Sequence, residues 1–199
     1  MIEIPKLEIH ISHACNLSCT SCSHYSNFRH RGLITAKYLE ESLCLWADKV
    51  SPKSFRMLGG EPFVNKELPE MCYIARNFFK NNIRVTSNIL LTETLQNIER
   101  YAQSFADNNI QLYISMHSID KKYVTKFEKA LSIWEKLSNK FNFEITSQDH
   151  YTNWFAPYKT VNGIIHPYND NSPRESWKSC GASQCKQLYN KKIYKCPAI

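Results

Sequence analysis

Short hydrophobic runs recur along the first 150 residues, and longer amphipathic stretches separate them. The strand-like runs are residues 7–12, 54–58, 83–86, 111–115 and 143–146. These runs are rich in β-branched and aromatic residues or alternate apolar with polar positions, as strands do. The stretches between them repeat apolar residues every three or four positions, which predicts helices within residues 36–50, 68–79, 95–105 and 124–134.

The regular alternation of strand and helix indicates the fold class. It predicts an α/β protein with a parallel sheet, right-handed crossovers and helices outside. In such folds, functional loops gather at the carboxyl ends of the strands. Cys15, Gly59, Asn88 and His117 each fall just past the end of an expected strand. We therefore expect these four residues, which are distant in the sequence, to meet at one rim.

The alternation ends near residue 150. Residues 153–177 are rich in proline, asparagine and aromatic residues, which predicts a loop or linker. Residues 186–195 resemble a β-hairpin that turns at Asn190, because asparagine tolerates positive φ angles. Cysteines flank this expected hairpin.

Composition and charge exclude several classes of protein. With 43% hydrophobic and 22% charged residues, the chain is globular rather than disordered. No run approaches the roughly 18 apolar residues that span a bilayer, and the first residues lack the pattern of a signal peptide. We therefore expect a cytoplasmic protein without a membrane partner. The net charge of +7 indicates either a solvated basic face or attraction for an anionic partner. No nucleic-acid motif accompanies it.

Eight cysteines in 199 residues form two groups and two isolated positions. In a cytosolic protein, clustered cysteines more often bind metal than form disulfides. The groups are Cys15, Cys19 and Cys22, and then Cys180, Cys185 and Cys196. Cys44 and Cys72 lie on or beside apolar helical faces, so we expect both to pack in the core as small hydrophobic residues.

The first group lies within one short loop, so three thiolates can converge on one metal centre. The run reads Cys15-Asn16-Leu17-Ser18-Cys19-Thr20-Ser21-Cys22. A cubane held by three cysteines leaves one iron open, as catalytic metal sites require, and the spacing differs from that of ferredoxins. Together with His24, the same cysteines would also suit a structural zinc site, which stays open as an alternative.

The Cys-x₃-Cys-x₂-Cys spacing after a first strand resembles the signature of the radical S-adenosylmethionine (SAM) superfamily. Cys15-Asn16-Leu17 resembles an opening common in its peptide-modifying and carbohydrate-modifying branches, and Gly59-Gly60-Glu61-Pro62 is similar to its Gly-Gly-Glu-Pro motif. The resemblance covers about residues 7–150. It implies a partial (β/α)6-type TIM barrel followed by a short C-terminal cysteine-bearing β-hairpin.

The resemblance also implies the cofactors and their contacts. A [4Fe–4S] cluster on the first three cysteines would bind SAM and cleave it reductively, with electrons from a flavodoxin-type or ferredoxin-type reductase. The implied SAM-binding residues are Gly59, Gly60, Glu61, Asn88 and Ser115. Two positions depart from the family pattern. Ile89 replaces the glycine of a Thr-Asn-Gly segment, and Ser21 replaces an aromatic residue, for which Tyr25 is a candidate substitute.

The second cysteine group resembles the SPASM/twitch extensions of this superfamily, which hold auxiliary iron–sulfur clusters. The resemblance implies such a cluster on Cys180, Cys185 and Cys196, although a cluster normally takes four ligands. Either the chain is a fragment, or the site is incomplete, or a non-cysteine ligand completes it; zinc or unliganded thiols are alternatives. The expected organisation is a partial barrel over 1–155, a linker or barrel-closing segment over 156–179 and the hairpin over 180–199.

The sequence therefore predicts a radical SAM enzyme that abstracts hydrogen from a peptide or from a carbohydrate or nucleotide sugar. His117 and Glu144 are the residues best placed to face the substrate. The aromatic residues Tyr151, Trp154, Phe155 and Tyr158 would line a pocket or plug the barrel. Two other classes remain: a non-catalytic zinc or iron–sulfur binding module, and an interaction protein on an inactive barrel.

Overall fold

The structure, a computed structural model, describes residues 1–20, 22–28, 31–148, 159–166 and 172–196. Its main feature is a seven-stranded sheet in the order β5-β4-β3-β2-β1-β8-β9. The strands are β1 Ile2–Ser12, β2 Val50–Gly59, β3 Asn82–Ser87, β4 Ile110–Ser115, β5 Ile145–Gln148, β8 Cys185–Tyr189 and β9 Lys192–Tyr194. Strands β1 to β5 are parallel, β8 is parallel to β1 on its other side, and β9 is antiparallel to β8. The predicted α/β class is confirmed, with β5 and β9 at the two open edges.

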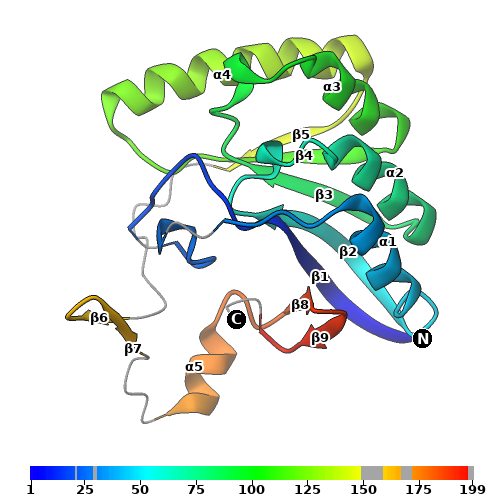
Figure 1. Ribbon diagram of the computed structural model, residues 1–199, viewed down its shortest axis with the longest axis vertical. Helices are drawn as coiled ribbons and strands as arrows, with labels where there is room; N and C mark the ends of the chain where they lie inside the picture. Colours follow the sequence, from blue (N-terminus) through cyan, green and yellow to red (C-terminus); the bar gives the residue numbers. More distant parts are fainter. Residues whose placement is uncertain (21, 29–30, 149–158, 167–171, 197–199) are drawn as a thin grey trace.

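Four helices cover one face of this sheet (Figure 1). They are α1 Ala36–Cys44, α2 Leu68–Phe78, α3 Ile98–Asp107 and α4 Lys121–Phe141, with short 3₁₀ turns η1 Ser26–Phe28, η2 Pro62–Val64 and η3 Thr92–Thr94. The hydrophobic core lies between the helices and alternate residues of β1 to β4, for example Leu7, Phe55 and Trp134. Each such buried side chain contributes roughly 1.5–3 kcal/mol. Burial in this core therefore determines which residues of each strand face the helices and which face away from them.

Several boundaries differ from the prediction, and two of these differences have a clear packing reason. The first helix ends at Cys44 rather than near residue 50, and Cys44 is exposed, so its expected place in the core is wrong. The buried residue next to it is Leu43, and one helical step turns Cys44 toward solvent. Cys72 is fully buried, as expected. Phe143 packs against Phe105 ahead of β5, so its apolar character reflects the core rather than a strand.

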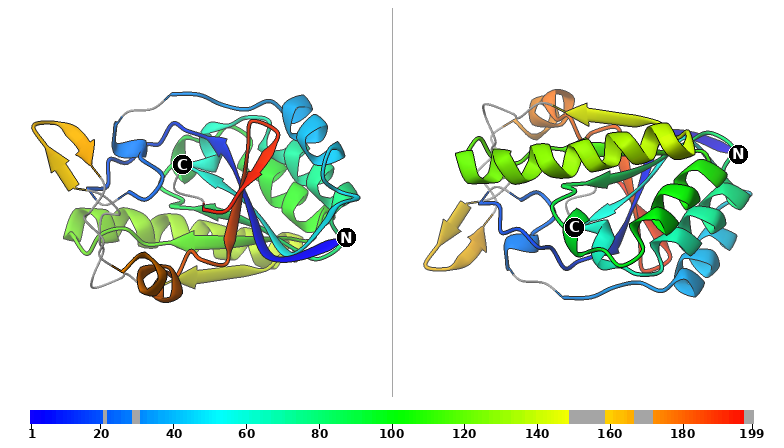
Figure 2. Two further views of the ribbon diagram at one scale, coloured as in Figure 1. Left: turned by 90° about the horizontal axis from the view of Figure 1, so that it is seen from below. Right: turned by 90° about the horizontal axis from the view of Figure 1, so that it is seen from above.

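Part of the predicted loop over residues 153–177 contains regular structure. The hairpin of β6 Lys159–Val161 and β7 Ile164–His166 stands apart from the main sheet, and the helix α5 Pro173–Ser179 buries none of its residues (Figures 1 and 2). The turn at Asn162 and Gly163 has positive φ angles at both residues. Asn-Gly between β-branched residues is a strong hairpin signal that the composition-based prediction missed.

The C-terminal hairpin β8–β9 is confirmed, and it turns at Asn190 as predicted. Asn190 and Lys191 have φ angles of 46° and 58°. The turn contacts α1 and the loop after it, because Trp46 Nε1 donates to Lys191 O at 2.9 Å and Lys191 Nζ pairs with Glu41 at 2.9 Å. The hairpin is thereby attached both to β1 and to the helical layer. Across the described ranges, no helix combines the length and apolar character needed to cross a bilayer.

Candidate functional site

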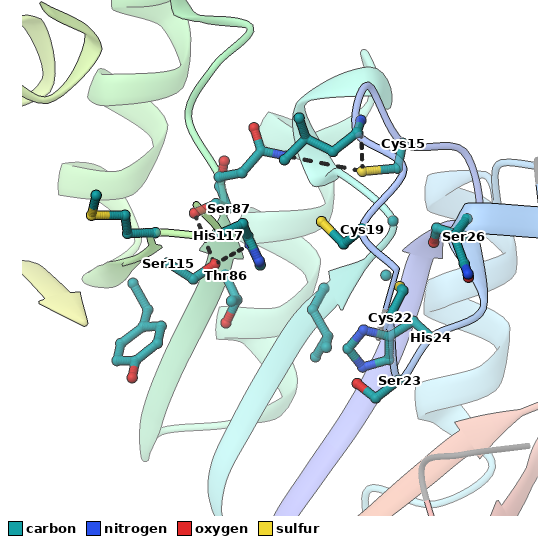
Figure 3. Close-up of a pocket in the computed structure, with 18 residues that line it drawn as sticks. Cys15, Cys19, Cys22, Ser23, His24, Ser26, Thr86, Ser87, Ser115 and His117 are labelled. Atoms are coloured by element: carbon teal, nitrogen blue, oxygen red, sulfur yellow. Dashed lines mark hydrogen bonds between the residues drawn. The ribbon is translucent and has the colours of Figure 1, made fainter. Parts of the chain in front are cut away.

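The first three cysteines line one cavity at the carboxyl ends of the central strands. Cys15, Cys19 and Cys22 are half-buried in the loop that follows β1. The cavity has a volume of about 180 Å³, and its opposite wall comes from the ends of β3 and β4, with Ser115 and His117 (Figure 3). The topology therefore brings the predicted rim residues together, because parallel strands end at one edge of the sheet.

The glycines after β2 allow the cysteine loop to run against the end of that strand. Gly60 N donates to Ser12 O at 2.7 Å, and Glu61 N donates to Ala14 O at 2.9 Å. A Cβ atom on Gly59 would lie 2.0 Å from Ser12 O, and one on Gly60 would lie 2.2 Å from Ala14 O. No side chain fits at those distances, and Gly59 also has a φ of +144°. Both glycines line the cavity, but the backbone that leads to Cys15 also requires them.

Glu61 lies behind the cavity wall and links β2 to β3. Its fully buried carboxylate accepts hydrogen bonds from Phe63 N at 3.1 Å, Ser87 Oγ at 2.8 Å and Asn88 N at 2.9 Å. Burial raises the pKa of Glu61 to about 7, although the three donors act in the opposite direction. The side chain therefore fixes the segment from Ser87 to Asn88 relative to the glycine turn.

A pair of amides connects the cysteine loop to the end of β3. Asn88 Nδ2 donates to Asn16 Oδ1 at 2.9 Å, and Asn16 Nδ2 donates back to Asn88 Oδ1 at 3.4 Å. Asn88 Nδ2 also lies 3.9 Å from Cys15 Sγ. The next residue, Ile89, has a φ of 55°, a left-handed conformation that is rare for a β-branched residue. Glycine, which the family resemblance implies at this position, adopts this conformation at no steric cost.

The wall opposite the cysteines contains a polar chain of contacts. Ser115 Oγ lies 2.9 Å from His117 Nε2 (Figure 3). The backbone N–H of His117 donates to Tyr123 Oη at 2.9 Å. Burial raises the pKa of Tyr123 to about 12. Tyr123 borders a neighbouring hollow that Cys19 and His117 also line. Sequence reasoning assigned no role to Tyr123, Asn16 or Ser87, although Asn16 and Ser87 lay within segments that resemble family motifs.

His24 also lines the cavity, beside Cys22. Burial lowers the pKa of His24 to about 4, with a smaller effect from His117. Its ring packs edge-on against His10 at 4.6 Å between centroids. Tyr25, the candidate substitute for the aromatic residue that Ser21 replaces, is not among the described residues that line the cavity. Ser21 itself lies outside the described residues.

The thiols of the first group share the cavity without standing in ligating positions. Within the described ranges, no three histidine, cysteine or acidic side chains are placed to hold a metal ion. This applies equally to an iron site and to the zinc site with His24. Burial raises the pKa of Cys15 to about 11 and also raises the pKa of Cys19. A bound cation would favour the thiolates and draw them together.

The C-terminal cysteines are less closely grouped. Cys185 is buried at the start of β8, Cys196 is half-buried, and Cys180 is exposed. The last pair of the hairpin joins Gln187 to Tyr194, and Cys185 and Cys196 each lie two residues beyond this pair, at the open end of the hairpin. The structure therefore brings two of the three predicted ligands to one end of the hairpin.

The candidate substrate residues divide into two sets. His117 lies at the rim, whereas Glu144 is exposed just before β5, at the other end of the sheet, and accepts a hydrogen bond from Gln111. The four aromatic residues proposed to line or plug the barrel lie outside the described residues: Tyr151, Trp154, Phe155 and Tyr158.

Comparison with known proteins agrees with this geometry. The family model described as the radical SAM superfamily matches residues 9–145. The chain belongs to the radical SAM superfamily. Members of this superfamily use a [4Fe–4S] cluster and SAM, and one similar solved structure contains bound AdoMet. The matched residues run from β1 to the start of β5 and include the whole cysteine loop and the glycine turn.

Two curated relatives are similar to parts of the chain. A probable GTP 3′,8-cyclase of Methanococcus aeolicus is 29% identical over 126 residues, which is 62% of this chain and 41% of the relative. An S-adenosylmethionine-dependent nucleotide dehydratase of Lacinutrix mariniflava is 22% identical over 174 residues, which is 85% of this chain and 35% of the relative. The chain thus spans less than half the length of either relative.

Two solved structures share the fold. Streptococcus suis SuiB bound to the precursor peptide SuiA matches 75% of this chain and 34% of its own, with a TM-score of 0.59 and 23% identity. The enzyme anSMEcpe with bound AdoMet and the Cp18Cys peptide matches 72% of this chain and 42% of its own, with a TM-score of 0.52 and 20% identity. At these identities, the similarity shows the fold alone.

Proposed function

We propose that this chain is a radical SAM enzyme that cleaves SAM reductively and removes hydrogen from a bound substrate. Cys15, Cys19 and Cys22 hold the [4Fe–4S] cluster in this proposal. The observation that supports it most is the shared cavity, which three thiols line on one side and the ends of β2, β3 and β4 line on the others. Three thiol ligands suit a cubane with one open iron.

The residues around the thiols fit a polar cofactor. Gly59, Gly60, Asn88 and Ser115 line the cavity and present backbone or side-chain polar groups; we propose that they bind SAM. Glu61 does not reach the cavity in the described residues, so its proposed role is to hold the glycine turn and Asn88 in register. Half-buried walls limit the access of water, which protects reactive species.

When bound, the cluster and SAM supply one-electron cleavage of a sulfur–carbon bond and an oxidant that removes hydrogen. The chain's own part is to orient and enclose these groups. The amide pair of Asn16 and Asn88 fixes the cysteine loop relative to β3. Ser115 and His117 stand on the opposite wall, where a substrate would approach. The electron donor in this proposal is a flavodoxin-type or ferredoxin-type reductase.

The proposed substrate class is a peptide or a nucleotide-type or saccharide-type molecule. The names of both curated relatives concern nucleotides, which supports the second class. The two solved structures contain peptides, which supports the first. In the proposed organisation, the partial barrel covers residues 1–155, a linker covers 156–179, and the hairpin of 180–199 carries the cysteines of an auxiliary cluster.

Anaerobic reconstitution tests the proposal. The purified chain is loaded with iron and sulfide, the two elements are counted, and SAM and dithionite are added. We expect a brown protein that forms 5′-deoxyadenosine, with about four irons per chain for one cluster and more if the C-terminal group also binds iron. Colourless protein with stoichiometric zinc would instead support a non-catalytic zinc module. An intact cluster that yields no 5′-deoxyadenosine would contradict the enzyme assignment and favour an inactive barrel.

A further inference from the structure

A row of polar and charged side chains crosses the sheet on the face turned away from the helices. Strand register places Glu8 beside Arg56, Arg56 beside Arg84, and Arg84 beside Gln111. Paired residues of neighbouring strands point to the same side of a sheet, so these four side chains share one face. The residues that flank them along β1 to β4 belong to the hydrophobic core under the helices. We call these four residues the polar row.

Within the part of the chain that the structure describes, the two arginines of the polar row use few of their hydrogen-bond donors. Arg56 donates from Nη1 to Glu8 Oε1 at 3.3 Å, while its buried Nε has no hydrogen-bond partner among the described residues. Arg84 donates from Nε to Gln111 Oε1 at 2.8 Å, and its guanidinium lies 4.5 Å from the centre of the Tyr113 ring. Each guanidinium has five N–H donors in a planar fork, so the pair retains unused donors for a ligand.

Charge in the polar row is unbalanced at its centre. Arg56 and Arg84 pair across adjacent strands, and the Glu8 carboxylate forms an ion pair with Arg56. A second carboxylate, on Glu144 beside the row, accepts a hydrogen bond from Gln111 and interacts electrostatically with Arg84. Like charges directly opposite in a sheet are destabilising. A bound anion would offset this repulsion, because planar guanidinium groups match phosphate and carboxylate in bidentate geometry.

The polar row lies directly below the candidate site. Arg56 and Arg84 each precede by two residues a side chain that lines the cavity, Leu58 and Thr86 respectively. Two residues of a strand cover roughly 6.6 Å. A molecule bound by the two arginines would therefore lie within about one side-chain length of the cavity that the cysteines line.

We propose that Arg56 and Arg84 bind an anionic group of the substrate, a phosphate or a carboxylate, one side-chain layer below the cavity. This inference rests on the proposed function, since it assigns a substrate class to the same site. The guanidinium forks fix one end of the substrate, and the rest of the molecule extends toward the thiols. The site then favours acidic substrates over neutral or cationic ones.

Calorimetric titration of the anaerobically reconstituted chain tests the inference with two probes, inorganic pyrophosphate and succinate. Arg84→Gln is the main variant, because removing Arg56 would leave the buried Glu8 carboxylate unpaired. Arg100→Gln is the matched control, since it removes the same charge from an exposed position on α3. We expect Arg84→Gln to weaken binding of the preferred probe roughly ten- to hundredfold. The wild type and Arg100→Gln should bind this probe with the same dissociation constant.

The two probes separate the sources of the anion, since preference for pyrophosphate indicates a phosphate group and preference for succinate indicates a carboxylate. Arg84→Lys keeps the charge but loses the fork, so it should weaken binding by less than Arg84→Gln does. If Arg84→Gln fails to fold, the lysine variant carries the test. Failure of the wild type to bind either probe, or equal losses in Arg84→Gln and Arg100→Gln, would overturn the inference. Formation of 5′-deoxyadenosine by the wild type tests the proposed function separately from these titrations.

Discussion

The two groups of cysteines in this chain are held in different ways. Cys15, Cys19 and Cys22 lie in one loop that hydrogen bonds from β2 and β3 fix on two sides. Cys185 and Cys196 depend on the register of a single short hairpin, and Cys180 is exposed beyond it. Residues that follow β2 and β3 therefore hold the start of the first cysteine loop, whereas local pairing holds the second group. The difference indicates that the loop of the first group is anchored before any ligand binds, whereas the second group has fewer anchors outside its own hairpin.

Replacing cysteines gives the largest expected effect and tests this comparison directly. Cys15→Ala, Cys19→Ala and Cys22→Ala should each lower 5′-deoxyadenosine formation at least about a thousandfold, because the cofactor carries the chemistry. Iron per chain and product after incubation with SAM and dithionite are the measurements. Cys44→Ala, at an exposed position, is the control and should retain both. Retention of iron and turnover in any of the three variants would remove the basis of the proposed function.

Gly60→Ala should disrupt the connection between the cysteine loop and β2. Its Cβ would lie 2.2 Å from Ala14 O, so backbone must move, and we expect a loss of about 4 kcal/mol or more in the free energy of unfolding. Urea denaturation of the apoprotein measures this loss. Gly181→Ala, near the second cysteine group, is the matched control because nothing lies within 4 Å of its Cβ position. Similar stability of the two variants would show that the loop is not held as described.

The buried carboxyl of Glu61 should make stability depend on pH. Its pKa is about 7 in the folded chain against 4.5 as a free group, so the folded chain binds more protons between these values. The stability from this group is therefore fully present below pH 4.5 and is lost as the pH rises to 7, by about 3 kcal/mol at most. Denaturation experiments across this pH window measure the difference in the free energy of unfolding between the wild type and Glu61→Gln. If this difference in the free energy of unfolding stays constant with pH, the raised pKa of Glu61 is contradicted.

The amide pair should show energetic coupling between the cysteine loop and β3. Asn16→Ala and Asn88→Ala each break the hydrogen bonds between the two amides. The double variant should therefore lose less free energy of unfolding than the sum of the losses in the two single variants. For residues in contact we expect a coupling energy of roughly 0.5–3 kcal/mol. A double-mutant cycle measured by urea denaturation gives this value. Strict additivity would mean that the pair does not hold the loop.

The smallest expected effect concerns the attachment of the C-terminal hairpin. Trp46→Phe removes the hydrogen bond to Lys191 O, which should cost about 0.5–1.5 kcal/mol locally. Amide hydrogen exchange in residues 185–194 should speed up, while exchange in β2 and β3 stays the same. Faster exchange throughout the sheet would show that the two cysteine groups are not independently held.

The sequence predicted the order of the main elements because hydrophobic periodicity records which face of each element is buried. It also predicted the rim, since the carboxyl ends of parallel strands meet at one edge. The contacts within the rim needed the structure. The reciprocal amides of Asn16 and Asn88 join residues distant in the sequence, and no spacing rule points to them. The same holds for Arg56 and Arg84, whose opposition depends on strand register.

Two further differences have local causes. Cys44 lies among apolar residues in the sequence, which predicted a buried position. A single helical step, however, separates the buried position of Leu43 from the exposed position of Cys44. The β6–β7 hairpin carried a recognisable Asn162-Gly163 turn, yet the surrounding composition indicated a loop. A positive φ at Ile89 has no signal within this sequence, because a β-branched residue would not be predicted there.

The parallel pairing of β1 with β8 also affects how the chain folds. Lys6 pairs with Cys185, so β1 completes its second ladder of hydrogen bonds only after nearly the whole printed sequence has been synthesised. Contacts this distant in sequence form slowly, since the intervening chain must first be ordered. Until then, the first strand presents an open edge that other chains could join. When the C-terminal hairpin docks, the outer edge becomes a three-residue strand with lysines at its start, which is a poor template for aggregation.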